Sequence, residues 1–233
     1  MNAEKFFDEI KKYGMSQSRI DSRKKVYREL RKGIDDCFEI ILLDMINGGW
    51  LTEHDASYYE DLLRAGYIRA AGSITDVSEE TFSRHTHLFV EEIIQSIVTK
   101  WNTVKPDDEN EDFQIARNLT LSGAESGMPL SRDEIPDEII AALGDERSQF
   151  ISADQSLYIN GHGEYTELVK SGATTKTWHT MEDEFVRPTH VALDEVTIPI
   201  DEYFISGASK LLFPRDTSQD PDPGEVILCR CFL

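Results

Sequence analysis

The spacing of apolar residues changes near residue 174, and this change restricts the possible folds more than any other feature of the chain. Upstream, apolar side chains recur every three or four residues, as they do on a helix that buries one side. Downstream, short segments rich in β-branched residues are typical of strands. We therefore predict an α+β fold, in which a mainly helical N-terminal bundle is followed by a small antiparallel sheet packed on a helix.

Four helices are predicted in the N-terminal part of the chain, over 3–13, 16–47, 52–71 and 76–102. The second shows the helical spacing most clearly, and the glycine pair at 48 and 49 ends it. Short turns between the helices favour an antiparallel bundle. The apolar positions of the second helix are Tyr27, Leu30, Ile34, Cys37, Phe38, Ile41 and Met45.

A boundary between two domains is predicted at residues 105–112, where a proline precedes a run of acidic side chains. Such a segment cannot bury apolar surface, so it is typical of an exposed linker. The linker separates a helical bundle, residues 1–105, from a C-terminal α+β domain, residues 106–233.

In the second domain we expect short helices at 112–122 and 133–143, a longer helix at 147–170, and strands at 174–180, 196–200 and 225–232. Gly161 and Gly163 lie inside the long helix. Each glycine costs roughly 1 kcal/mol relative to alanine in a helix, so we expect a kink or close packing at this point.

The chain has a formal net charge of −20, which disfavours loose binding to nucleic acid or to an anionic membrane. One basic cluster stands out, in the first part of the second helix. It is either a contact for DNA or an acidic partner, or a solvated helix face. Its residues are Arg19, Arg23, Lys24, Lys25, Arg28, Arg31 and Lys32.

We expect neither a transmembrane helix nor a signal peptide, because there is no apolar run of about 18 residues and no charged leader followed by an apolar segment. The three cysteines do not suggest a secreted disulfide framework. Reduced thiols are therefore expected, in the cytoplasm or in a particle assembled there.

Cys229 and Cys231 lie two residues apart, so on a strand both thiols face the same side. There they can bind a zinc ion, with His190 as the third ligand and His179 or Asp183 as the fourth. The alternative is that both cysteines are small core residues. A disulfide between the two would be strained.

A second interpretation of this region needs no metal. A guanidinium, Arg187, held by Asp183 and by strand carbonyls, would lock the turn between Trp178 and His190. His190 would then donate to a backbone carbonyl or to Asp194. This arrangement explains the residue types without any reaction.

Catalysis is the weakest interpretation. His190 could act as the base for either cysteine as the nucleophile, or could form an acid–base pair with Asp194. No oxyanion loop, glycine-rich phosphate cradle or signature of a metal-bound water accompanies either pair. No catalytic residue is therefore assigned.

The order of these residues resembles the Mu F-like minor head proteins, the phage head morphogenesis family, over roughly residues 110–233. Two positions depart from the family pattern: Glu195 stands where glycine is usual, and Leu228 where asparagine is usual. Because glutamate does not readily adopt a positive φ, we expect no two-residue Asp-Gly hairpin turn at Glu195. The matching residues are Trp178, Asp183, Arg187, His190, Leu193, Asp194, Phe204, Pro214, Cys229, Arg230 and Cys231.

The resemblance implies a minor head protein that binds the portal protein or the major capsid protein and assists head assembly, DNA packaging or DNA delivery. It implies a place inside the virion head, with assembly in the host cytoplasm, and no enzymatic activity. The alternative is a free-standing cytoplasmic domain that binds zinc or is related to toxins.

Overall fold

The computed structural model describes residues 7–13, 15–46, 53–72 and 143–233. Over these residues the fold is α+β, as predicted, with helices first and short antiparallel strands after them. The expected fourth helix, the linker at 105–112 and the helix at 112–122 lie outside the described residues. So do the helix at 133–143 except for its last residue, and the boundary between residues 105 and 106. The antiparallel bundle therefore stays a prediction.

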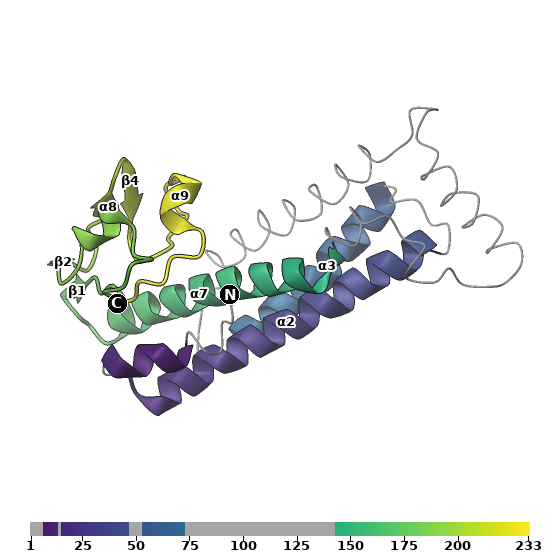
Figure 1. Ribbon diagram of the computed structural model, residues 1–233, viewed down its shortest axis with the longest axis horizontal. Coiled ribbons are helices and arrows are strands. Elements are labelled where there is room, and N and C mark those ends of the chain that lie inside the picture. The colour runs from purple at the N-terminus through teal and green to yellow at the C-terminus, as the bar shows by residue number, and fades with distance from the viewer. Residues whose placement is uncertain (1–6, 14, 47–52, 73–142) are drawn as a thin grey trace, which may run out of the picture. The chain divides into compact units, whose positions relative to one another are not determined.

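The long helices agree with the predicted segments. They are α2 (Gln17–Ile46), α3 (Glu53–Ala71) and α7 (Asp145–Lys170) (Figure 1). Residues 7–13 are also helical and end in the 3-10 turn η1 (Ile10–Tyr13). Helical spacing sustained over many residues fixes the extent of these elements well, because apolar side chains recur along one side of each helix.

The chain divides into two compact units, each built from separate stretches of sequence. Among the described residues, the first unit contains 7–30, 68–72 and 151–233, and the second contains 31–67 and 143–150, apart from the gaps given above. In the second unit Arg31 is ion-paired with Asp35 and Asp145, and the buried Cys37 thiol lies 3.7 Å from the carbonyl oxygen of Tyr59.

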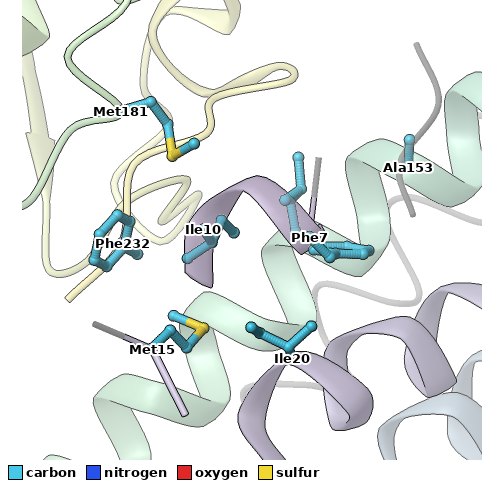
Figure 2. Packing of buried hydrophobic residues seen from close by; sticks show 8 residues of the cluster. Phe7, Ile10, Met15, Ile20, Ala153, Met181 and Phe232 are labelled. Carbon is cyan, nitrogen blue, oxygen red and sulfur yellow. The ribbon is translucent and has the colours of Figure 1, made fainter. Parts of the chain in front are cut away.

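The first unit has an apolar core that joins both ends of the chain. Phe7 and Ile10 from the N-terminal segment belong to the same buried cluster as Met181 and Phe232 from the C-terminal part (Figure 2). Met15, Ile20, Ala153 and Leu157 complete the cluster. The N-terminal residues therefore fold together with the C-terminal part, although they are far from it in sequence.

Among its described residues, the first unit also contains two sheets of two strands each. In one, β1 (Thr175–Thr177) pairs antiparallel with β2 (Thr197–Pro199), close to two of the predicted strands. In the other, β3 (Phe204–Ser206) pairs antiparallel with β4 (Ser209–Leu211). The sequence does not predict this second hairpin, because three-residue strands are too short to show a repeating pattern.

The strand predicted at 225–232 is wrong. Its beginning lies in the short helix α9 (Pro223–Val226), where the Asp222 side chain accepts a hydrogen bond from the backbone N–H of Gly224. The carbonyls of Cys229 and Cys231 then accept hydrogen bonds from the guanidinium of Arg215 instead of from a neighbouring strand. Phe232 alone keeps a strand-like pairing, with His179.

Close packing at the glycines of α7 is confirmed for Gly161. A Cβ atom at this position would lie 3.0 Å from the carbonyl oxygen of Pro214 and 3.1 Å from Nη2 of Arg215. The helix continues to Lys170, so Gly161 does not end it. The glycine instead allows the 213–215 loop to approach the helix closely. This approach places Arg215 next to the C-terminal cysteines.

Candidate metal centre

His190, Cys229 and Cys231 form one buried cluster in the C-terminal part of the first unit. Their ligand atoms all lie within 4.8 Å of one another. The Sγ atoms of Cys229 and Cys231 are each 3.5 Å from Nδ1 of His190. The exposed fractions of the three residues are 1% for His190 and Cys229 and 3% for Cys231. Both thiols therefore face one nitrogen of one imidazole, away from solvent.

Two short segments hold these side chains in place. His190 lies on the single-turn helix α8 (Pro188–Val191), whose start is favoured by a proline at the first helical position. The cysteines follow α9, and the buried guanidinium of Arg215 donates through Nη1 to the carbonyls of both. One cation therefore fixes the backbone at both thiol-bearing residues.

The second ring nitrogen of His190 faces a carboxylate. Its Nε2 lies 3.0 Å from Oε2 of Glu225. The geometry of this contact falls outside that of an ordinary hydrogen bond. The same carboxylate accepts hydrogen bonds from Thr189 Oγ1 at 2.8 Å and Ser206 Oγ at 2.6 Å.

These contacts keep Glu225 ionised. Burial opposes its charge, but hydrogen bonds from Ser206 and Thr189 together with His190 outweigh burial, and the pKa of Glu225 is lowered from its ordinary value. An anion is therefore held against the imidazole nitrogen that points away from the thiols.

The aromatic ring of Trp178 packs against the cluster. It is completely buried, and its ring centroid lies 5.2 Å from that of His190 in an edge-on arrangement. Trp178, Cys229 and Cys231 belong to one apolar core, together with Leu193, Phe204 and Leu211. The tryptophan, the histidine and both cysteines are thus brought together, as the sequence pattern requires for a single compact module.

The indole N–H of Trp178 also acts on the Cys231 thiol. Among the described residues it has no hydrogen-bond partner of ordinary geometry, yet it favours the thiolate form of Cys231. Hydrogen bonding to Cys229 and burial outweigh this effect and raise the pKa of Cys231. Burial also disfavours a charge on Cys229, but its contacts with Cys231, His190 and Arg215 lower the pKa of Cys229. The groups around the cluster therefore stabilise a sulfur anion.

A small cavity lies beside the cluster. It has a volume of about 10 Å³, and His190, Cys231 and Arg187 are among the residues that line it. A cavity of this size holds a single water molecule. A nucleophilic cysteine must be reachable by its substrate, and this buried cluster with room for only one water molecule suits metal binding better than catalysis on a substrate.

The predicted pairing of Asp183 with Arg187 is wrong. Asp183 accepts two hydrogen bonds from the guanidinium of Arg230, one of them 2.7 Å long. Arg187 instead donates to the carbonyl oxygen of Ile227. The arginine between the two cysteines therefore takes the partner expected for Arg187, because it lies on the segment that passes Asp183.

The structure also changes the expected partners of three other side chains. Asp194 accepts a hydrogen bond from the backbone N–H of Thr180 at 2.7 Å, so Glu225 and not Asp194 faces His190. His179 lies 3.1 Å from Glu195 and, like Asp183, lies outside the cluster of ligand atoms. Neither is therefore the fourth ligand that the sequence suggested.

Both positions that depart from the family pattern have left-handed backbone conformations. Glu195 has φ 60° and Leu228 has φ 50°, in the region that glycine and asparagine adopt most readily. The expectation that Glu195 avoids a positive φ is wrong. No hairpin turn forms here, because the residue connects α8 to β2 and does not join two strands.

Two residues of this site are not predicted from the sequence. Glu225 lies in the segment predicted as a strand, and Arg215 has no predicted role. Arg215 follows β4 and acts on backbone atoms, which leaves no signal in the sequence spacing. Glu225 lies only four residues before Cys229, so an acidic residue near two cysteines is its one available signal.

Within the part of the chain that the structure describes, no helix combines the length and the apolar character needed to cross a membrane.

A family model described as Phage Mu protein F like protein matches residues 115–233, just over half of the chain. No curated protein and no solved structure matches the chain significantly.

Proposed function

Because this chain belongs to the family of phage Mu protein F-like proteins, we propose that it is a minor head protein that binds the portal protein or the major capsid protein during head assembly. The observation that carries the proposal is the family match over residues 115–233. Within the matched segment, Trp178, His190 and the two cysteines build one buried core. The proposed role is structural, with assistance to assembly, DNA packaging or DNA delivery.

Exposed apolar side chains on the C-terminal module, residues 174–233, support a docking role. Phe185 has an exposed fraction of 72%, and Val191, Ile205 and Ile227 are also large apolar residues exposed on this module. Phe185 is the most exposed of the four, so it is the one most available for contact with another protein. We propose that Phe185 takes part in the contact with the portal or capsid protein.

The basic cluster of α2 gives DNA binding little support. Arg23 is buried and paired with Glu164, Lys24 lies 2.6 Å from Asp8, and Arg31 is paired inside the second unit. These contacts favour a helix face that serves the protein itself. The net charge of −20 further suits a protein enclosed with packed DNA without adhering to it.

Particle composition tests this proposal. We expect the protein to be present in purified phage heads and to be retained by immobilised portal or major capsid protein at low and moderate salt. Replacement of Phe185 by Ser should weaken this retention, whereas Glu184→Ser, which changes a neighbouring exposed residue, should not. Absence from particles together with no retention by either partner would contradict the proposal and favour a free-standing domain with no role in a virion.

A further inference from the structure

We propose that His190, Cys229 and Cys231 bind one zinc ion through Nδ1 and the two Sγ atoms, and that this ion fixes the fold of the C-terminal module. The inference is independent of the function proposed above, because it rests on the ligand geometry of one buried cluster.

The distances between the ligand atoms fit tetrahedral zinc. Bonds of about 2.3 Å to sulfur and about 2.0–2.1 Å to nitrogen, at a tetrahedral angle, separate a nitrogen ligand from a sulfur ligand by about 3.6 Å. The observed separation of His190 Nδ1 from each Sγ is 3.5 Å. Both nitrogen–sulfur separations therefore already match those of a tetrahedral zinc site, and all three ligand atoms lie within 4.8 Å of one another.

Glu225 supplies the orienting partner that a zinc-bound histidine needs. A histidine that binds metal through one ring nitrogen usually presents its other N–H to a carboxylate, which fixes the tautomer. Here Nδ1 faces the thiols and Nε2 faces Glu225 at 3.0 Å. Hydrogen bonds from Thr189 and Ser206 hold the carboxylate in place. The arrangement thus selects Nδ1 as the metal ligand.

The charges around the cluster also balance when zinc is bound. Two thiolates neutralise the dication, and Arg215 at the cysteine carbonyls and Glu225 beside His190 add one charge of each sign. Uncompensated charge in a buried site costs several kcal/mol per ion. A zinc ion with both cysteines deprotonated therefore leaves the site close to neutral.

The fourth coordination position fits a water molecule. The cavity of about 10 Å³ that His190 and Cys231 line has room for one. Three protein ligands with a water molecule is the coordination of catalytic zinc sites, but these ligands are buried and the cavity that His190 and Cys231 line has a volume of only about 10 Å³. The ion therefore acts structurally, by joining α8 to the segment after α9.

Metal analysis of the whole chain is the primary test. Protein loaded with zinc under reducing conditions and then freed of loosely bound metal should retain about one zinc per chain. Titration of metal-free protein with Co²⁺ should give the absorption of tetrahedral cobalt bound to thiolates. A chain that retains no zinc and gives octahedral cobalt spectra would overturn the proposal. Both measurements use the unaltered chain, so they do not depend on the folding of any variant.

Variants then assign the ligands. Cys229→Ser and Cys231→Ser should each lose the zinc, and Cys37→Ser, which removes a buried thiol in the second unit, should retain it. Glu225→Gln should bind zinc about 10- to 100-fold more weakly while keeping the tetrahedral cobalt spectrum. Loss of zinc in Cys37→Ser, or full retention in both Cys229→Ser and Cys231→Ser, would show that the ion binds elsewhere and overturn the assignment.

Discussion

Several residues near the candidate metal centre have a backbone conformation that side chains other than glycine rarely adopt. Glu195, Arg215 and Leu228 all have positive φ, between 50° and 73°. A left-handed conformation costs roughly 1 kcal/mol for such residues. Hydrogen bonds offset this cost for two of the residues. The guanidinium of Arg215 donates to the carbonyls of Cys229 and Cys231. The backbone N–H of Leu228 donates to Asp154 at 2.6 Å. Glu195 is exposed, so its conformation has less to offset its cost.

We therefore expect Glu195→Gly to stabilise the protein by about 0.5–1 kcal/mol, because glycine adopts this φ without a steric penalty. The exposed contact with His179 contributes little that would be lost. Chemical denaturation of the variant measures the change. Glu184→Gly is the matched control, since Glu184 is exposed but has no positive φ. A loss of stability at residue 195 equal to the loss at residue 184 would contradict the argument.

We expect Lys176 to make the stability of the protein depend on pH. Lys176 is buried, and its Nζ donates to the carbonyl oxygen of Ile200 at 2.7 Å. Burial lowers the pKa of Lys176 from 10.5 to about 8. The unfolded chain therefore holds this proton more tightly than the folded one. Stability is reduced below the folded pKa and rises as the pH increases from about 8 to 10.5.

Replacement of Lys176 by Met removes this titration. The difference in melting temperature between the natural chain and Lys176→Met should shift in favour of the natural chain over this pH range. Thermal unfolding of both proteins between about pH 7 and pH 11 measures it. Parallel curves over the whole range would show that the ammonium is not desolvated on folding.

At the scale of elements, the length of a pattern decides what the sequence can predict. α2 and α7 repeat their apolar spacing over many residues, so their bounds follow from sequence. α8, α9, β3 and β4 have three or four residues each, too few for any period to show. Asp222 and Pro223 do mark the start of α9 as a helix cap, and this local signal is stronger than the alternation that favours a strand.

The residues of the candidate metal centre also differ in how far the sequence predicts them. His190, Cys229 and Cys231 are residue types that bind zinc, so chemistry alone singles them out. Arg215 acts through two backbone carbonyls and Glu225 through the far nitrogen of His190. Such supporting contacts depend on how the short elements fold, and sequence spacing does not encode them.

The packing of α7 on the 213–215 loop gives a prediction for glycine. Gly161→Ala should destabilise the protein by about 1–3 kcal/mol despite the gain in helix propensity, because the new methyl group would press on the Pro214 carbonyl and Arg215. Gly172 has φ 76°, and a methyl group added there would meet no atom beyond its chain neighbours within 4 Å. Gly172→Ala should therefore cost about 1 kcal/mol through strain alone.

Asparagine variants distinguish steric contact at Gly161 from backbone strain at Gly172. Gly172→Asn should be close to the natural chain, because asparagine tolerates a left-handed conformation at a helix end. Gly161→Asn should be at least as damaging as Gly161→Ala, because its side chain is larger. Unfolding free energies of the four variants decide the matter, and equal effects of asparagine at both positions would exclude the steric explanation.

At the scale of the whole molecule, the folded unit extends beyond the segment matched by the family. The match begins at residue 115, yet Phe7 and Ile10 are completely buried in the cluster that contains Met181 and Phe232. The buried pair of Arg23 and Glu164 adds a polar link between α2 and α7 in the same unit. The C-terminal module therefore depends on residues near the N-terminus for part of its core.

Truncation of Ile10 tests this dependence within the full chain. Ile10→Ala should destabilise the protein by about 2–5 kcal/mol, because a completely buried side chain leaves a cavity beside Met181 and Phe232. The control Lys11→Ala changes an exposed neighbour and should stay within about 0.5 kcal/mol of the natural chain. If the N-terminal segment supports the C-terminal module, Ile10→Ala should also speed modification of Cys229 and Cys231 by a thiol reagent in the native state. Lower global stability with unchanged reactivity of these two thiols would mean that the module opens independently of the N-terminal segment.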